Sequence, residues 1–323
     1  MSRSADVEDR SSREPAKGPD GTSDPLAAVI ALLRPRTVLP KLISGAGQWS
    51  VRYAAHEEPG FCIMLEGTCL LDVEGVGEVW LEEGDFVLLP STPSFTRSSG
   101  RGVKPRSATP AAGVALRHGT QSGPPTMRQL GGYFHVERAN ARLLERFLPA
   151  MILVRRDEPG AARLRQLVEL IGEEATARRA GRELILERLV EVLLVEALRV
   201  RPAEATGQEQ GLLAGLADPG IARALRRLHA DVAHRWTVAE LGRAAGMSRA
   251  VFAERFTRTV GMPPMEYLLE WRIAVAKDVL RRERVALAEV AERIGYQSAS
   301  AFSVAFSRHA GCSPSGFARS MRV

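Results

Sequence analysis

The amino-acid sequence predicts an α+β protein with more than one domain: an N-terminal β-barrel with a helical segment, then an all-α domain built from two helix-turn-helix units. Three observations predict this fold class. Short apolar runs separated by Gly and Pro fill residues 36–136, helical periodicity begins near residue 140, and the last third contains an internal repeat. The 323 residues suffice for two domains and a tail.

The N-terminal end of the chain offers little that a core can bury. Residues 1–24 are rich in Ser, Arg, Asp, Gly and Pro, so we expect a disordered tail. Asp24 and Pro25 then form an N-cap followed by a first-turn proline, which predicts the start of a short helix. Its apolar side would carry Leu26, Val29, Ile30 and Leu33.

Residues 25–138 are predicted to form the β-barrel domain. The runs 61–64 and 69–73 flank Glu66-Gly67, which is typical of a hairpin. A third run, 79–81, continues through Glu82-Glu83-Gly84-Asp85 into the fourth, 86–89. Many short strands with such turns favour a sandwich or a barrel.

Residues 139–200 are predicted to be helical and to serve as a dimerisation segment. One apolar face would hold Leu143, Leu144, Phe147 and Leu148, and a second would hold Leu164, Leu167, Val168 and Ile171. The third helix, 182–200, has a stripe broad enough to pack on the β-domain and also to meet a second subunit, although a purely internal role fits equally well. This stripe consists of Leu184, Ile185, Leu189, Val192, Leu193 and Val195. Residues 201–211 contain no large apolar side chain and are predicted to be a linker.

The domain at 212–323 contains two copies of one pattern. Residues recur at a constant offset of 50, pairing Ser248 with Ser298, Phe252 with Phe302, Phe256 with Phe306, Arg258 with Arg308, Gly261 with Gly311 and Pro264 with Pro314. Each copy has the order helix, glycine-containing turn, serine N-cap, second helix, closing glycine and proline. This order predicts a helix-turn-helix, because glycine permits the tight corner and serine caps the second helix. A helix at 264–281 would separate the two units.

The second helix of each unit is the candidate DNA reader. Its two phenylalanines lie at i and i+4 on the buried face, so the opposite face is free for a major groove. With the N-terminal residues, the first candidate set is Ser248, Arg249, Ala250, Ala253, Glu254, Thr257 and Arg258. The second set is Ser298, Ser300, Ser303, Val304, Ser307 and Arg308. Glu254 would accept from a cytosine amino group, and the alanines and Val304 would contact thymine methyl groups.

The charge distribution supports a DNA partner. Residues 212–323 contain 17 Arg and Lys against 10 Asp and Glu, whereas residues 1–211 contain 27 against 28. A cationic surplus confined to one domain favours binding to a phosphate backbone, although a solvated basic surface would give the same count. No apolar run reaches the length of a membrane span and no signal peptide is evident, so we expect a cytoplasmic protein without a membrane partner.

Residues 236–321 resemble the DNA-binding domain of the AraC/XylS family of transcription regulators. The matching stretches are WTVAELGRAAGMSRAVFAERF, WRIAVAKDVL and VAERIGYQSASAFSVAFSRHAGCSPSGFAR. The resemblance implies a sequence-specific transcription factor that binds promoter or operator DNA, forms a homodimer, and has RNA polymerase as a candidate partner. Many members carry Arg at the place of Val304 and a polar residue at that of Ala253. This departure implies that the second recognition helix acts more as a phosphate anchor than as a reader.

Residues 25–200 resemble the cupin-type sensor domain found in such regulators, through GFCIMLEGTCLLDVEG, VWLEEGDFVLLPSTPSF and QLGGYFHV. Catalytic cupins depend on His and Glu metal ligands. This chain has His56 with Glu57, Glu58 and Glu66 nearby, but no HxH pair. We therefore expect no enzyme activity, no catalytic residue, no metal and no cofactor. A cupin metalloenzyme with an accessory DNA-binding domain is the alternative, and a purely architectural DNA-binding protein is another.

Two signals are candidates for the sensor. In the expected hairpin, Cys62 would lie opposite Leu71 and Cys69 opposite Met64, so the two thiols would be diagonal neighbours that oxidation joins. Buried apolar packing is the simpler interpretation of both cysteines. The second signal is an unidentified small molecule held in the barrel. Its candidate lining is Trp49, Tyr53, Phe61, Trp80, Phe86 and Tyr133.

Overall fold

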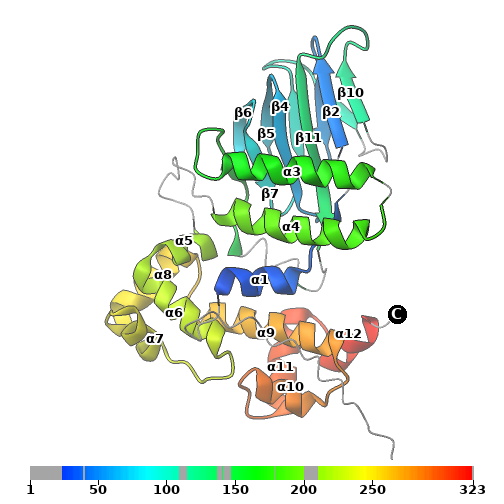
Figure 1. Ribbon diagram of the computed structural model, residues 1–323. Coiled ribbons are helices and arrows are strands. Elements are labelled where there is room, and N and C mark those ends of the chain that lie inside the picture. Colours follow the sequence, from blue (N-terminus) through cyan, green and yellow to red (C-terminus); the bar gives the residue numbers. More distant parts are fainter. Residues whose placement is uncertain are drawn as a thin grey trace, which may run out of the picture.

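The computed structural model describes residues 24–38, 41–108, 115–136, 140, 147–177, 179–199 and 210–321. Residues 1–23 of the predicted tail, most of the linker at 201–211, and Leu143 and Leu144 of the first predicted helix lie outside these residues. The described chain forms a β-domain at one end, a helical domain at the other, and a layer of helices between them (Figure 1).

The β-domain consists of two sheets. The larger sheet has the order β10-β2-β11-β4-β7-β12, with β1 also paired to β11. Its strands are β1 (Arg36–Val38), β2 (Lys41–Ala46), β4 (Gly60–Glu66), β7 (Phe86–Leu89), β10 (Ala115–Gly119), β11 (Met127–His135) and β12 (Ile152–Val154). The smaller sheet has the order β6-β5-β8-β3-β9. Its strands are β3 (Ser50–Tyr53), β5 (Thr68–Val73), β6 (Gly77–Glu82), β8 (Phe95–Ser98) and β9 (Arg106–Ala108).

The larger sheet is covered on both faces. Along β4, Cys62 and Met64 join the core between the sheets, whereas Phe61 and Ile63 join the core beneath the helices. Burial on both faces explains why this strand is an unbroken apolar run instead of an alternating one. The described strands form two facing sheets with no hydrogen-bonded closure into a single barrel. The predicted α+β class is confirmed, with a sandwich where a barrel was expected.

The predicted hairpin around Glu66-Gly67 is wrong. β4 pairs with β11 and β7, whereas β5 pairs with β6 and β8, so the two strands belong to different sheets. Gly67 has a φ of 70°, and a Cβ there would lie 2.1 Å from the carbonyl oxygen of Thr126. The glycine thus lets the chain cross from one sheet to the other at a tight corner. Both edges of each strand are occupied, which leaves no edge for the expected pairing.

Two helices, α3 (Ala161–Thr176) and α4 (Arg182–Arg199), cover the outer face of the larger sheet (Figure 1). The predicted face of α3 is buried, with Leu164, Val168 and Ile171 fully inaccessible. Gly172 permits a close approach, because a Cβ at this position would lie 2.8 Å from a methyl of Leu130 on β11. The helix that begins with the Asp24 cap is α1 (Pro25–Leu33), as predicted.

The C-terminal domain consists of eight helices among the described residues. They are α5 (Leu212–Ala217), α6 (Pro219–Ala230), α7 (Val238–Ala245), α8 (Arg249–Val260), α9 (Pro264–Arg282), α10 (Leu287–Arg293), α11 (Ala299–Ala310) and α12 (Pro314–Ser320). The pairs α7–α8 and α10–α11 are the two predicted helix-turn-helix units. Helix α9 belongs to both cores, because Tyr267 and Trp271 pack with the first unit and Ile273 and Leu280 with the second.

One contact fixes the two units relative to each other. Arg272 of α9 donates from Nε to the carbonyl of Val232 at 3.0 Å and from Nη2 to that of His234 at 2.8 Å. The same guanidinium lies over the ring of Tyr296, which precedes the second recognition helix. Gly295 has a φ of 79°, and a Cβ there would lie 2.2 Å from the carbonyl oxygen of Ala233.

The sensor and the helical domain share one apolar core, and α1 is central to it. Helix α1 contacts α4 on the sensor side and α6 and α9 on the other side. Phe147 stacks on Tyr267 of α9 with ring centroids 4.7 Å apart. Arg34, which follows α1, forms an ion pair of 3.2 Å with Asp278 of α9. The two domains are therefore joined by buried packing as well as by the linker.

Candidate nucleic-acid interface and sensor cavity

The recognition helices begin at side-chain caps. Ser248 accepts from the backbone N–H of Val251 at 3.4 Å, and Ser298 accepts from that of Ala301 at 3.1 Å. These caps satisfy N–H groups that a helix start leaves without a partner. Both helices end at a glycine in the left-handed region, Gly261 and Gly311.

The phenylalanines orient each recognition helix. All four are fully buried, and they pack as neighbouring rings 5.5 Å apart within each unit. The opposite faces are accessible over both candidate sets. The exposed residues of the first set are Ser248, Arg249, Ala250, Glu254, Thr257 and Arg258, and Ala253 is half-buried. The exposed residues of the second set are Ser298, Ser300, Val304 and Arg308, and Ser303 and Ser307 are half-buried.

The first recognition helix carries a cation and an anion on its accessible face. Arg258 Nη1 lies 3.8 Å from Glu254 Oε1, and both side chains are mostly in solvent. Exposed ion pairs contribute little to stability, so DNA can replace this contact at small cost. Arg255, one position from Glu254, is committed elsewhere, because its Nε donates to Asp218 at 2.6 Å.

Asp218 links the recognition helix to the start of α6. It accepts from the backbone N–H groups of Gly220 and Ile221 while it pairs with Arg255. Burial raises the pKa of Asp218, but these hydrogen bonds outweigh it and hold the pKa below its ordinary value. The carboxylate is therefore charged and fixes α8 against α6.

The second recognition helix presents a different surface. Val304 at its centre is an apolar side chain that is 65% exposed. Three serines and Arg308 complete this face, which thus offers one cation and no anion. The two accessible faces therefore differ in their charged and polar groups, and the division of roles between the two helices stays a prediction.

Residue-by-residue reasoning missed a basic groove beside the first unit. It is lined by Arg223, Arg226, Arg227, Trp236, Glu240, Arg243 and Ala244. Arg223 donates to the carbonyls of Ala244 and Ala245 at the end of α7, whereas Arg226 and Arg227 are exposed. The signal was present, because residues 223, 226 and 227 follow helical i, i+3, i+4 spacing.

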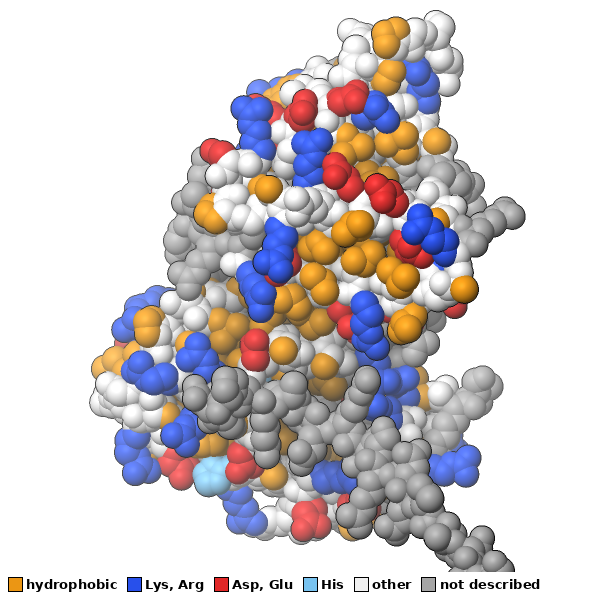
Figure 2. Space-filling view, viewed as in Figure 1, with side chains coloured by type: hydrophobic (Ala, Val, Ile, Leu, Met, Phe, Trp, Pro, Cys, Tyr) orange, Lys and Arg blue, Asp and Glu red, His pale blue; other side chains and the backbone are white. Residues whose placement is uncertain are grey.

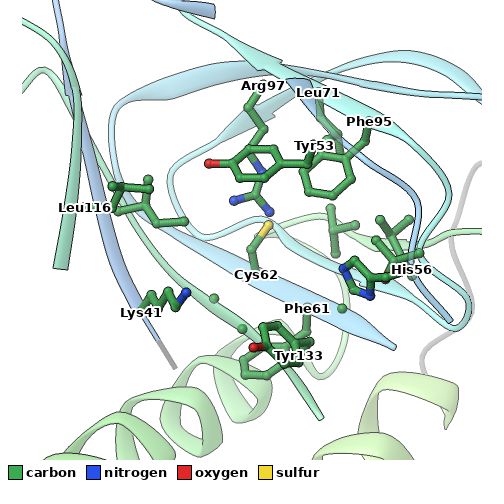
Figure 3. A pocket seen from close by; sticks show the side chains of 17 residues that line it. Lys41, Tyr53, His56, Phe61, Cys62, Leu71, Phe95, Arg97, Leu116 and Tyr133 are labelled. Atoms are coloured by element: carbon green, nitrogen blue, oxygen red, sulfur yellow. The ribbon is translucent and has the colours of Figure 1, made fainter. Parts of the chain in front are cut away.

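A cavity opens between the two sheets of the β-domain. It has a volume of about 90 Å³, and its walls come from β2, β3, β4, β5, β7, β8, β10 and β11 together with His56 and Thr92. Of the predicted lining, Tyr53, Phe61 and Tyr133 border it (Figure 3). Trp49 and Phe86 are buried in the surrounding cores, and Trp80 is exposed on β6.

Polar groups also border this cavity. The hydroxyl of Tyr53 and Nε2 of His118 share a hydrogen bond of 3.1 Å. Burial, together with the charge of Arg97, lowers the pKa of His118, so this ring is neutral at neutral pH. Burial likewise lowers the pKa of His56, against the opposing effect of Glu58. Figure 3 shows Arg97 extending into the cavity beside Tyr53 and Cys62.

Two of the carboxylates that lie near His56 in the sequence form ion pairs. Glu58 pairs with His135 at 2.5 Å and Glu66 pairs with Arg128 at 2.8 Å. Within the described part of the chain, no three His, Cys, Asp or Glu side chains gather as a metal site. The expectation of no metal and no cofactor stays a prediction.

Both sensor cysteines are buried, and their expected register is wrong because β4 and β5 are not paired. Cys69 nevertheless lies beside Met64, with 3.8 Å between the two sulfur atoms, because both residues point into the core between the sheets. Burial raises the pKa of Cys62, and it raises that of Cys69 to about 12. Oxidation proceeds through the thiolate, which burial disfavours here. A redox role for the two cysteines stays a prediction.

Comparison with known proteins identifies both domains. Residues 24–201 match the family model described as Cupin, and residues 241–320 match that described as a helix-turn-helix domain. An AraC-like transcription regulator of Streptomyces lividans is 38% identical over 301 residues, which are 91% of this chain and 97% of the relative. A second such regulator, from Streptomyces antibioticus, is also 38% identical, over 91% of this chain and 98% of its own. The chain belongs to the AraC-like transcription regulators.

Two solved structures are also similar to parts of this regulator. The DNA-binding domain of AdpA in complex with a target DNA is 30% identical, covering 32% of this chain and 94% of that chain with a TM-score of 0.31. ToxT from Vibrio cholerae O395 is 11% identical, covering 87% of this chain and 96% of that chain with a TM-score of 0.35.

The family places this AraC-like regulator among DNA-binding transcription regulators, with a cupin-like domain preceding the helix-turn-helix domain. Its relatives are named as regulators and not as enzymes. No helix within the described residues is long and apolar enough to cross a membrane.

Proposed function

We propose that α8 is the principal reader of base sequence and that α11 mainly positions the protein on the DNA backbone. The accessible face of α8 carries this proposal, because it combines Glu254, Thr257 and Arg258, which together offer donors and acceptors to base edges. The corresponding face of α11 has Val304 at its centre and Arg308 as its cation, so its polar readout is limited to serines.

A selection of bound sequences from random DNA tests this division. Glu254→Ala should relax the preference at one base-pair position, at a cost of about 1–3 kcal/mol in discrimination. Arg308→Ala should weaken binding to all sequences alike and reduce the slope of log affinity against log salt by about 1. Arg165→Ala, which removes an exposed i, i+4 ion pair on α3 of the sensor, is the matched control and should change neither.

Two results would contradict the division of roles. If Arg308→Ala altered the selected sequence while Glu254→Ala did not, α11 would be the reader. If neither substitution changed the preference and random DNA competed equally with the selected site, the chain would be an architectural DNA-binding protein.

We further propose that a small molecule in the cavity between the sheets regulates DNA binding. The cavity is enclosed by strands, and β4 exposes Cys62 to it while burying Phe61 and Ile63 in the core that reaches the helical domain. Occupancy of the cavity can therefore shift strands that also pack against α3, α4 and α1. Thermal-shift screening of the full chain should find ligands whose stabilisation is lost in Leu116→Trp, which fills the cavity, and which change DNA affinity. Cavity-dependent ligands without effect on DNA affinity would overturn this proposal.

We also propose that the chain is a homodimer formed through α3 and α4. Figure 2 shows hydrophobic side chains gathered at the middle of the molecule, over these helices. Leu184, Ile185 and Val192 on α4 are 59%, 43% and 40% exposed, and Leu170 on α3 is 49% exposed. Exposed apolar clusters of this kind are typical of interaction surfaces. A DNA-binding regulator acts where the chromosome is, so we place it in the cytoplasm, where RNA polymerase is a candidate partner.

A further inference from the structure

Arg97 occupies an unusual position for a charged residue. It lies on β8, the middle strand of the smaller sheet, where its neighbours in register are Val51 on β3 and Leu71 on β5. Val51 and Leu71 are 7% and 1% exposed and belong to the core between the sheets. The same face therefore directs the Arg97 side chain into the interior of the sandwich.

The guanidinium of Arg97 has no protein acceptor among the described residues. Its Nε is buried without a hydrogen bond, and its one ring contact is with Phe95, at 5.2 Å from the ring centroid. Arginine remains charged at every physiological pH. Burying a cation without an anion or a full set of acceptors is costly, and proteins seldom retain such a group without a partner.

No acidic side chain is available to this cation from the cavity wall. Its 17 lining residues include two cations, Lys41 and Arg97, and no Asp or Glu. The carboxylate of Asp85 already has its partners, because it accepts from Arg155 Nη1 at 2.8 Å and from the backbone N–H groups of Glu82 and Arg156. His118 faces Tyr53 as a neutral ring and supplies no negative charge.

The rest of the wall is apolar and aromatic. Phe95 stacks on Tyr53 with centroids 4.9 Å apart, and the remaining surface is lined by Leu71, Val87, Leu89 and Leu116. In Figure 3 the guanidinium of Arg97 lies close to the Tyr53 ring and the Cys62 sulfur. A hydrated inorganic ion would leave these apolar surfaces in contact with water, whereas an organic molecule would cover them.

We propose that the cavity binds a small organic anion, whose carboxylate accepts hydrogen bonds from Arg97 and whose apolar part packs against Tyr53, Leu71 and Phe95. This inference rests on the proposed role of the cavity as the effector site and specifies the chemistry of its ligand. The volume of about 90 Å³ limits the size. Because a single water molecule occupies about 10–15 Å³, a cavity of this volume admits a small organic molecule of the size of hexanoate or benzoate.

Matched pairs of acid and neutral amide test the charge requirement on the full chain. The probes are hexanoate with hexanamide and benzoate with benzamide, titrated by calorimetry. At least one acid should bind ten-fold or more tightly than its amide. Arg97→Met keeps the length of the side chain without the charge and should abolish this preference, whereas Arg97→Lys should keep part of it.

The thermal stability of the ligand-free variants separates a binding role from a structural one. If Arg97 serves a ligand, Arg97→Met removes a half-buried charge that has no acceptor among the described residues, and its melting temperature should equal or exceed that of the wild type. A fall of several degrees in Arg97→Met would show that Arg97 serves the fold and would overturn the inference.

The binding outcomes distinguish this inference from the proposal on which it rests, that the cavity is the effector site. If the amides bound as tightly as the acids and Leu116→Trp abolished their binding, the cavity would still be the effector site. The requirement for an anion would then be wrong. Acids that bind equally to the wild type and to Arg97→Met would overturn the assignment to Arg97. Failure of all four probes to bind the wild type would overturn the ligand class at this size, while the screen that tests the effector site remains independent of it.

Discussion

His229 shows how a single side chain makes the stability of the helical domain depend on pH. It lies on α6, shares a hydrogen bond of 2.8 Å with the hydroxyl of Tyr267, and lies against Trp271 with ring centroids 4.2 Å apart. Burial lowers the pKa of His229 to about 3. Because the unfolded chain takes up a proton near pH 6.5 and the folded chain does not, the stability from neutral His229 is present above pH 6.5 and is lost as pH falls toward 3.

Urea unfolding at pH 7, 6 and 5 measures this effect. From pH 7 to pH 5 this one group should lower the free energy of unfolding by about 2 kcal/mol, since each pH unit below the unfolded pKa costs up to about 1.4 kcal/mol. His229→Gln keeps a hydrogen-bonding group for Tyr267 but does not titrate, so its loss over the same range should be smaller by that amount. Equal pH slopes in the wild type and the variant would show that His229 is not buried in neutral form.

Several residue assignments were predictable from sequence because they depend on local chemistry. Serine caps, closing glycines and phenylalanines at i and i+4 act within one helix, so Ser248, Ser298 and the four phenylalanines take their predicted places. Arg97 was not predictable in this way. Its position in the interior depends on which strands flank β8, and the sequence Phe-Thr-Arg-Ser does not contain that information.

At the scale of elements, helix α9 and the contact at Gly295 determine how the two helix-turn-helix units are spaced. A side chain at Gly295 meets two obstacles, a positive φ and the carbonyl oxygen of Ala233. Gly311 has a similar φ of 72° but open space around it. Comparing substitutions at the two glycines therefore distinguishes the effect of backbone strain from the effect of the contact between the units.

Gly295→Ala and Gly311→Ala form a matched pair. Both should lose about 1 kcal/mol of stability or more from the strained backbone. Only Gly295→Ala should also displace the second unit, and DNase footprints should show protection reduced over the half of the site that α11 covers. If Gly295→Ala gave the wild-type footprint and had the same stability as Gly311→Ala, the contact at Gly295 would not set the spacing of the two units.

The strands show the limit of sequence reasoning at the same scale. The apolar runs located β4, β5, β6 and β7 correctly, but the order of strands in a sheet follows from long-range packing. Glu66-Gly67 has the composition of a hairpin turn, and it becomes a crossing between sheets because β11 and β7 already occupy both edges of β4. A period-two pattern identifies a strand and leaves its neighbours open.

At the scale of the whole molecule, the exposed stripe on α4 predicts the oligomeric state. Ile185, Leu189 and Val192 follow i, i+4, i+7 spacing, which is the pattern of a helix that packs against another helix. A dimer would bury Ile185 and Val192, which a monomer leaves in water, whereas Leu189 already packs partly against the core.

Sedimentation velocity tests the dimer. The double variant Ile185→Glu with Val192→Glu should sediment as a monomer at concentrations where the wild type is dimeric, because the interface would then bury unpaired charge. Val76→Glu, at a residue that is 41% exposed in the turn between β5 and β6, is the control and should remain dimeric. A wild type that is monomeric throughout would contradict the assignment, as would a double variant that stays dimeric.

The position of α1 between the sensor and the helical domain bears on how the molecule melts. Domains joined only by a linker give separate heat-absorption peaks, because each can lose its structure while the other persists. Here the apolar side chains of α1 belong to a cluster that extends from Phe134 of the larger sheet to Trp271 of α9. Loss of either half exposes that cluster, so the calorimetric trace should show one peak. Compounds that occupy the sensor should then raise the melting temperature of residues far from them, including the helices that contact DNA.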